Sequence, residues 1–452
     1  TFMQSILDKS SPEIQPVFLD YSKDITKLKI KNNIEVLYAP NTENKRFDLY
    51  YVINMGTNHD KKLKIATQYL EYLGTKQLKP DQVKKEFYKL ACTFSVKVSE
   101  EETRLNLSGL TENFEQALHL FENLLMDVQP NEEALTNLIA DIKKQRVDAK
   151  LNKGTILYSG LYNYARYGKI SPFTNVLSSL ELDNLKSSEL VDIIHQLTSY
   201  EEHVLFYGNI ETAQLTALLD KHHETPAALK PVPKPVNFTE TNPNTNVYVV
   251  DYDMKQAEVL IQSTDGPYNK NNAPEVRLFN QYFGGGFGSI VFQEIRESKA
   301  LAYSVNSRYL YGTKNTDNNY VQSYIGTQAD KLPEAMASMM NLMENMPESE
   351  PAFVTSKESV LQSLRSQRIT KTDILFNYEN SKKFGLDYDI RKDLYAKVPT
   401  LTLADVKNFD QGHLKGKQYN VLAIGKKDAL DLKTLEKYGP VTFLSLEDIF
   451  GY

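Results

Sequence analysis

The sequence predicts an α+β fold of two homologous domains, each a mostly antiparallel sheet with helices packed on one face. Three observations lead to this fold class. Several segments recur in order at offsets near 210–222 residues, and a proline-rich stretch separates the two copies. Within each copy, runs of strands are followed by runs of helices. The composition is that of an ordinary globular chain, since 41% of the 452 residues are hydrophobic and 24% are charged.

The repeat is clearest in matched strands and helix pairs. Two strand pairs correspond across this offset: VLFYG at 204–208 with VLAIG at 421–425, and FDLYYVINM at 47–55 with AEVLIQST at 257–264. In both copies an apolar helix, then Pro130 or Pro347, then a second helix follow in the same order. Several matches in order at one offset indicate duplicated units of about 200–220 residues.

The boundary between the copies is marked by proline. HHETPAALKPVPKPVNFTETNPNTN (222–246) contains five prolines, which cannot continue a helix or a central strand and favour an extended linker. We therefore expect a lead-in segment at 1–24, a first domain at 25–222, a Pro-rich linker at 223–246 and a second domain at 247–452. His222 and His223, at the edge of this linker, are expected to be solvated rather than to bind a metal.

The first domain illustrates how the elements are assigned. LKIKNNIEVLYAP (28–40) is typical of a hairpin, because Asn32-Asn33 suits positive φ at a tight turn. FDLYYVINMG predicts a strand, IATQYLEYLGTK (65–76) a helix that a glycine stops, and residues 93–110 an antiparallel strand pair. Two helices follow. Cys92, the only cysteine, lies among apolar residues and is expected to be a buried small side chain.

Charge and hydropathy restrict the partners. The net charge of −6 argues against nucleic acid or an anionic membrane, since both attract basic patches. No apolar run approaches the length of a membrane span. The chain starts at Thr1 without a basic-then-apolar leader, so we expect a fragment or a processed product.

The segment Phe283–Val305, FGGGFGSIVFQEIRESKALAYSV, contains the candidate functional residues. Its glycines lack the Walker pattern G-x-x-x-x-G-K-[ST], so we expect a tight loop that allows close backbone approach, not a phosphate loop. The guanidinium of Arg296 can form charge-assisted hydrogen bonds with carbonyl or carboxylate oxygens. The hydroxyl of Tyr303, seven positions later, can donate a hydrogen bond to an oxygen that carries negative charge. The alternative is a solvated Arg296 and a Tyr303 packed in the core at the start of a strand.

These segments carry a family resemblance. The opening hairpin, the strand and helix at 47–76, and above all Phe283–Val305 resemble the pitrilysin/insulinase family of zinc metallopeptidases, the inverzincins. Their metal motif is H-x-x-E-H on a helix, in which two histidines hold Zn²⁺ and the glutamate acts as general base. The matching positions here read Gln68-Tyr69-Leu70-Glu71-Tyr72, so Gln68 and Tyr72 replace both ligands and only Glu71 remains. Asp141 is the candidate for the distal acidic ligand, and none of the seven histidines forms the motif elsewhere.

The resemblance implies a chain that binds no catalytic zinc, has no cofactor of its own and is inactive alone. It is similar to the zinc-less half of two-half members, whose Arg and Tyr, matched here by Arg296 and Tyr303, reach the substrate at the zinc of the other half. The expected partners are an H-x-x-E-H-bearing half, in the same longer chain or a separate subunit, and peptides that add to a sheet edge of that half. Long bacterial members favour a periplasmic or cell-envelope location.

Two alternatives stay open. The chain could be a catalytically inactive structural or binding module of the same fold, as in core subunits of the mitochondrial respiratory complex. It could also bind zinc through an unrelated site.

Overall fold

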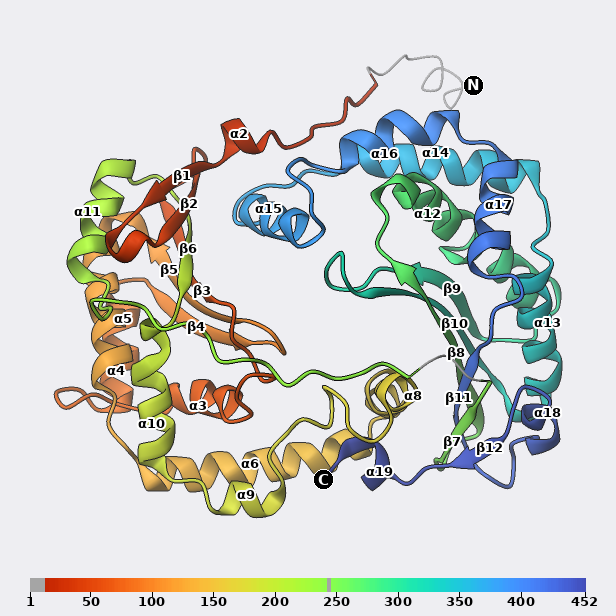
Figure 1. Cartoon of the computed structure of the whole chain (residues 1–452), viewed down its shortest axis with the longest axis horizontal. Helices are drawn as coiled ribbons and strands as arrows, with labels where there is room; N and C mark the ends of the chain where they lie inside the picture. The colour runs from red at the N-terminus through yellow and green to blue at the C-terminus, as the bar shows by residue number, and fades with distance from the viewer. Residues whose placement is uncertain (1–12, 242–244) are drawn as a thin grey trace, which may run out of the picture. The chain divides into compact units, whose positions relative to one another are not determined.

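The structure, a computed structural model, describes residues 13–241 and 245–452, so part of the expected lead-in (1–12) and of the expected linker (242–244) lie outside it. The strands form two six-stranded sheets (Figure 1). The chain packs as two compact units: one holds residues 22–260, 371–376 and 418–452, and the other holds the remaining described residues. The domain bounds 25–222 and 247–452 remain a prediction about the duplicated segments.

The first sheet has the strand order β1-β2-β6-β3-β5-β4. Its strands are β1 (Thr26–Lys29), β2 (Glu35–Pro40), β3 (Arg46–Ile53), β4 (Thr93–Val98), β5 (Thr103–Leu110) and β6 (Glu202–Gly208). β2 and β6 are parallel, and the other neighbours are antiparallel. The β1–β2 turn contains Asn32 and Asn33 at φ 58° and 62°, so the predicted Asn-Asn hairpin is confirmed.

Helices cover this sheet because their apolar stripes must be buried. The helices of this part of the chain are α2 (Tyr21–Asp24), α3 (Leu63–Leu70), α4 (Pro80–Lys89), α5 (Phe114–Asp127), α6 (Glu132–Lys150), α7 (Lys153–Thr155), α8 (Tyr162–Tyr167), α9 (Ser179–Asp183), α10 (Ser187–Gln196) and α11 (Thr212–His222). Of these, α3, α5 and α11 contact strands of the first sheet, whereas α8 contacts β11 (Asn420–Gly425) of the second sheet. Phe114 of α5 packs edge-on against Phe47 of β3 and Phe206 of β6, with ring centroids 4.8 and 5.4 Å apart. Cys92 is buried and unpaired, as predicted.

The second sheet has the order β12-β7-β11-β8-β10-β9. Its strands are β7 (Val247–Asp251), β8 (Gln256–Pro267), β9 (Ser304–Leu310), β10 (Asn318–Gln328), β11 (Asn420–Gly425) and β12 (Val441–Phe443). The later helices are α12 (Ala273–Phe279), α13 (Leu332–Glu344), α14 (Glu350–Ser366), α15 (Asp373–Lys383), α16 (Arg391–Lys397), α17 (Leu403–His413), α18 (Leu432–Glu436) and α19 (Leu446–Phe450).

The two sheets repeat one topology. The order β2-β6-β3-β5-β4 corresponds strand by strand to β7-β11-β8-β10-β9. A non-glycine residue with positive φ precedes the last strand of each series: Ala91 before β4 and Ala300 before β9, both at φ 50°. The predicted α+β fold class with two sheet–helix assemblies is therefore confirmed.

The helix predicted at 65–76 differs in its end. α3 stops at Leu70, and the chain continues in tighter turns in which Tyr72 N–H donates to Tyr69 O and Leu73 N–H to Leu70 O. The reason lies at Gly74, where a Cβ atom would stand 2.3 Å from Leu78 O. The chain doubles back here too closely for a continuing helix, so Tyr72 lies beyond α3.

Candidate functional site

The glycine cluster is a tight loop in front of the Arg296 helix. A Cβ atom on Gly284 would lie 2.0 Å from Ser307 O of β9, and Gly286 has φ 91°. Both positions therefore need glycine: the first for close backbone approach, the second for its backbone angle. The loop leads into a π-helical segment, η7 (Phe292–Ser298), which bears Arg296. Wide turns of this kind are frequent at functional sites.

Arg296 is held by aromatic rings. Its guanidinium carbon lies 4.7 Å from the Phe292 ring centroid and 5.7 Å from that of Tyr303. Its nearest acidic neighbour is Glu297, with Nε 3.7 Å from Oε1, which is too long for a hydrogen bond. Stacked rings orient a guanidinium while its N–H edge stays available for a carbonyl or carboxylate.

Tyr303 lies at the surface immediately before β9. Its backbone N–H donates to Gly326 O at 2.9 Å, and its side chain is 77% exposed. The alternative of a core-packed Tyr303 is therefore wrong. The structure brings Tyr303 and Arg296 together, and the left-handed Ala300 between them turns the chain from the helix into the strand. Phe287, also 77% exposed, packs edge-on against Phe292 with ring centroids 5.2 Å apart.

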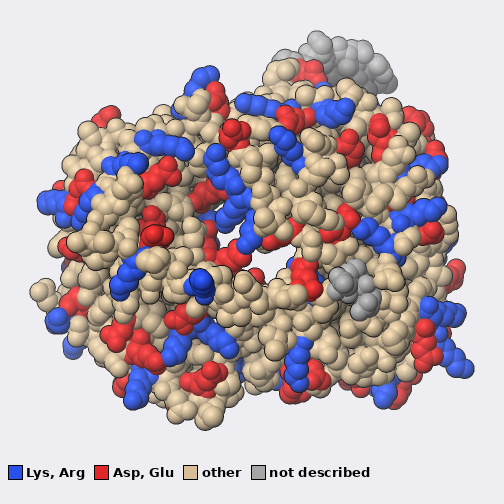
Figure 2. Space-filling view, in the orientation of Figure 1, with Lys and Arg blue, Asp and Glu red and all other residues tan. Residues whose placement is uncertain are grey.

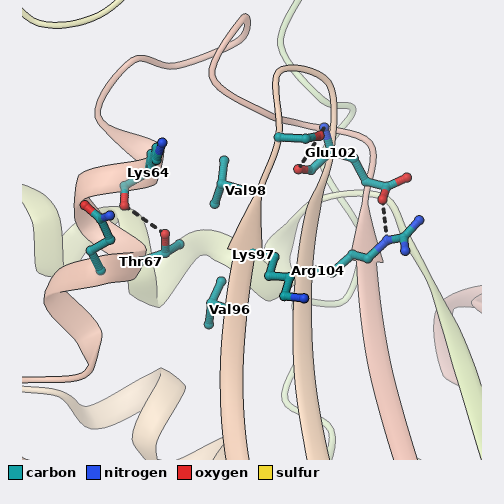
Figure 3. A pocket seen from close by; sticks show the side chains of 9 residues that line it. Lys64, Thr67, Val96, Lys97, Val98, Glu102 and Arg104 are labelled. Atoms are coloured by element: carbon teal, nitrogen blue, oxygen red, sulfur yellow. Dashed lines mark hydrogen bonds and ion pairs between the residues drawn. The ribbon is translucent and has the colours of Figure 1, made fainter. Parts of the chain in front are cut away.

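The positions of the degenerate metal motif do not converge. Gln68 of α3 lines a hollow of about 500 Å³ beside β4 (Figure 3). Tyr72 lines a different hollow of about 460 Å³ together with Asp141, and its ring lies 5.9 Å from Lys84 Nζ. Glu71 caps α3 and is exposed. An amide and a phenol that face different hollows do not fit a zinc site.

No other metal cluster takes their place. Within residues 13–241 and 245–452, no group of three or more His, Cys, Asp or Glu side chains could hold a metal ion. On the face seen in Figure 2, basic and acidic side chains are interspersed. A partner that binds this face therefore meets no large patch of a single charge, and its binding depends on contacts with individual side chains.

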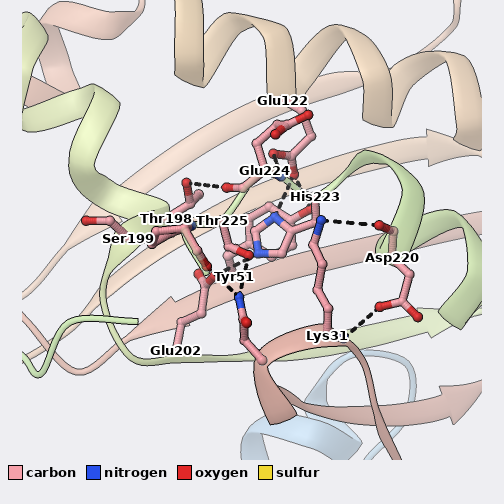
Figure 4. Close-up of polar contacts among 12 residues, drawn as sticks. Lys31, Tyr51, Glu122, Thr198, Ser199, Glu202, Asp220, His223, Glu224 and Thr225 are labelled. Atoms are coloured by element: carbon pink, nitrogen blue, oxygen red, sulfur yellow. Dashed lines mark hydrogen bonds and ion pairs between the residues drawn. The ribbon is translucent and has the colours of Figure 1, made fainter. Parts of the chain in front are cut away.

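His223 belongs to a buried ionic network that the sequence did not reveal (Figure 4). The prediction that it is solvated is wrong, because its side chain has no exposed surface. Its Nδ1 lies 2.9 Å from Glu122 Oε1 and its Nε2 2.7 Å from Glu202 Oε1. The Tyr51 hydroxyl also donates to Glu122. The only sequence signal is that Glu122 lies one turn after Leu118 on the apolar stripe of α5.

The charges of this network stabilise one another. Burial lowers the pKa of His223, but the Glu202 and Glu122 carboxylates outweigh it and raise that pKa to about 10. Burial raises the pKa of Glu202. A protonated His223 between two carboxylates ties the end of α11 to α5 and β6. Its role is structural, since both ring nitrogens are already engaged. His222, in contrast, bonds to the half-exposed Glu115.

Comparison with known proteins shows which family of proteins this chain resembles. Residues 203–352 match the family model described as "Peptidase M16 inactive domain". The fold is that of the Pseudomonas fluorescens peptidase M16 inactive domain, with a TM-score of 0.70 at 17% identity over 90% of this chain and 99% of that one. It is also that of the periplasmic protease PqqL from Escherichia coli, with a TM-score of 0.70 at 18% identity over 93% of this chain but 47% of that one.

Proteins of similar sequence point to the same family. The chain is 22% identical over 331 residues to an uncharacterized zinc protease of Rickettsia felis, which covers 71% of this chain and 76% of the relative. It is 23% identical over 390 residues to the non-peptidase homolog YmxG of Helicobacter pylori, which covers 78% and 83%. The resemblance to the pitrilysin/insulinase (M16) peptidases, and to their inactive domain in particular, is therefore confirmed.

Proposed function

We propose that this chain is the non-zinc-binding half of a two-half zinc metallopeptidase. It completes the substrate chamber and contributes Arg296 and Tyr303 to a peptide bound at the zinc of an H-x-x-E-H-bearing half. The main support is the surface pair itself: a ring-stacked Arg296 beside a Tyr303 that is 77% exposed. Burial of the Tyr303 ring in the core would stabilise the fold, and an exposed ring gives up this stabilisation. Its exposure therefore favours a contact with another molecule.

The two side chains have different tasks in this proposal. The free edge of the Arg296 guanidinium binds a backbone carbonyl or carboxylate of the peptide and orients it. The Tyr303 hydroxyl donates a hydrogen bond to the oxygen that becomes negative at the scissile carbonyl. Zinc, held by the partner half, would activate the attacking water. Since Tyr303 acts mainly on the developing charge, its loss affects the chemical step more than substrate binding.

The partner half is either part of a longer chain or a separate subunit. The match to 47% of PqqL supports the first arrangement, and the match to 99% of the Pseudomonas fluorescens chain supports the second. PqqL is described as periplasmic, which supports a similar location for this chain. In the described residues no helix combines the length and hydrophobicity needed to cross a bilayer.

The second candidate function is a non-catalytic binding or structural module of the same fold. It is favoured by the name of YmxG, a non-peptidase homolog that this chain matches over 83% of its length. The two functions differ in one respect: only the peptidase half requires the surface positions of Arg296 and Tyr303.

Reconstitution separates the two functions. The chain is mixed with an H-x-x-E-H-bearing half of the same family from the same organism, and hydrolysis of a quenched fluorescent peptide library is followed. The peptidase proposal expects activity only in the mixture, and a loss when Arg296→Ala replaces the wild-type chain. A mixture that binds peptides but does not cleave them would establish the binding module instead.

A further inference from the structure

The second sheet borders a small polar hollow that the proposed function does not use. The hollow has a volume of about 210 Å³ and lies where the ends of β8, β9 and α17 meet the start of α12. Two of the residues that line it, Asp265 and His413, form a hydrogen bond of 2.6 Å between Oδ2 and Nδ1. All of the lining residues belong to one compact unit of the chain.

The carboxylate of Asp265 is engaged at both oxygens. Its Oδ2 also accepts a hydrogen bond from the Tyr309 hydroxyl at 2.6 Å, and its Oδ1 accepts one from Lys417 Nζ at 2.6 Å. Burial raises the pKa of Asp265, but the hydrogen bonds from His413, Lys417 and Tyr309 outweigh it and hold that pKa below its usual range. Asp265 therefore stays ionised, and because Lys417 balances it, the hollow contains no uncompensated negative charge from this residue.

His413 has one ring nitrogen available to a ligand. Because the ionised Asp265 accepts a hydrogen bond from Nδ1, that nitrogen carries a proton. Nε2 has no hydrogen-bond partner among the residues that the structure describes. The ring is fixed by Phe409, which stacks on it with centroids 4.3 Å apart, and by Tyr309, which packs edge-on at 5.5 Å. The imidazole is thus held in place while Nε2 remains available.

Two further donors line the hollow without an acceptor in the described part of the chain. They are the hydroxyl of Tyr311 and the side-chain N–H₂ group of Asn272, whose amide oxygen accepts from Asn269. Burial raises the pKa of Tyr311, so its hydroxyl stays protonated at neutral pH. Glu275, the only acidic residue of α12, does not line the hollow. Donors that lack acceptors favour a ligand with negatively charged oxygens.

The buried network of the first domain shows which arrangement such a ligand would complete. There, His223 lies between two carboxylates, Glu122 at Nδ1 and Glu202 at Nε2. His413 has the equivalent of the first, Asp265 at Nδ1, and lacks the second. A ligand carboxylate at Nε2 would place a protonated histidine between two anions in the same way.

We propose that this hollow binds a small organic carboxylate, which accepts hydrogen bonds from His413 Nε2, the Tyr311 hydroxyl and the Asn272 amide. The apolar part of the ligand packs against Val276 and Pro267, which line the same hollow. The volume is that of about seven water molecules, so the ligand is a small acid and not a peptide chain. The site includes none of the residues proposed to act on the peptide substrate, so it can exist whether or not the peptidase role is correct.

A fluorinated benzoate tests the proposal on the unaltered chain. The probe is 4-fluorobenzoate, and its binding is followed by ¹⁹F NMR line broadening as the protein is titrated. We expect saturable binding, and binding at least about tenfold weaker for 4-fluorobenzamide, which has a similar shape without the charge. Equal binding of the two probes, or no saturable binding of the benzoate up to about 10 mM, overturns the proposal.

Two variants test whether the benzoate binds in this hollow. His413→Asn keeps an amide N–H near the position of Nδ1 for Asp265 but has no atom at Nε2, and Tyr311→Phe removes only a hydroxyl. Each should weaken binding by about fivefold or more. The controls are His119→Asn on α5 and Tyr88→Phe on α4, both exposed, which should bind like the wild type. Far-UV circular dichroism checks that each variant is folded; if His413→Asn is not, Tyr311→Phe alone decides. Wild-type affinity in the folded hollow variants contradicts the assigned site.

Discussion

Replacing His223 by glutamine should be strongly destabilising, because the side chain holds two buried carboxylates. His223, Glu122 and Glu202 expose at most 2% of their side chains. Glutamine keeps a hydrogen-bond donor but removes the positive charge. Glu202 then loses the buried cation that faces it, and its second oxygen already has no hydrogen-bond partner among the described residues. Breaking a buried ion pair on one side typically costs about 3–5 kcal/mol, and we expect a loss in that range for His223→Gln.

The cost of His223→Gln in unfolding free energy should depend on pH, because the fold raises the pKa of His223. In the unfolded chain His223 has an ordinary pKa near 6.5, and in the folded chain about 10. Its stabilisation is complete below about pH 6.5 and is lost as the pH rises towards 10. The difference in unfolding free energy between wild type and His223→Gln should therefore shrink to less than half of its pH 6.5 value by about pH 10.

Urea titration followed by far-UV circular dichroism measures this free energy. The control is His222→Gln, at the neighbouring position, because His222 hydrogen-bonds to the half-exposed Glu115 and not to a buried carboxylate. Its cost should stay below about 1 kcal/mol. If His223→Gln costs no more than His222→Gln, or if its cost does not fall with pH, the buried ionic network does not stabilise the fold as described.

Three further predictions concern the backbone and the metal. Ala300→Gly should raise the free energy of unfolding by about 1 kcal/mol, because φ 50° strains any residue with a Cβ atom, and a loss of stability would contradict this. Gly284→Ala should lower it by about 1–3 kcal/mol or more, since the new methyl meets Ser307 O at 2.0 Å; a neutral result in urea titration would refute the close approach. The purified chain should contain far less than one equivalent of zinc by atomic emission, because Gln68 and Tyr72 line different hollows. Stoichiometric zinc would show an unrelated site.

Local patterns predicted most of the fold. The Asn32-Asn33 turn and the alternation in β4 and β5 depend on neighbours in the sequence, so the hairpin and the strand pair could be assigned from short segments. The duplication was visible because both copies retain the same apolar strands. The early end of α3 was missed, because Gly74 is constrained by Leu78 across a turn and not by its helical neighbours.

The site was predictable only in part. The family resemblance indicated Arg296 and Tyr303 as a candidate pair, but the sequence could not show that Tyr303 is exposed or that the guanidinium lies over the Phe292 ring. The network around His223 was missed, because Glu122 lies 101 positions away in the chain. Contacts over such separations depend on the assembled sheet, and no local pattern encodes them.

The kinetic effect of Tyr303→Phe in the reconstituted pair tests the central claim most directly. The change removes one hydroxyl from a side chain that is 77% exposed, so the fold should be unaffected. Tyr88→Phe, at an exposed tyrosine of α4, is the matched control. We expect Tyr303→Phe to lower kcat by about 10²–10³ with little change in KM, as for the loss of one oxyanion donor, and Tyr88→Phe to have no effect. A Tyr303→Phe chain that supports the full wild-type kcat would contradict the role assigned to this residue.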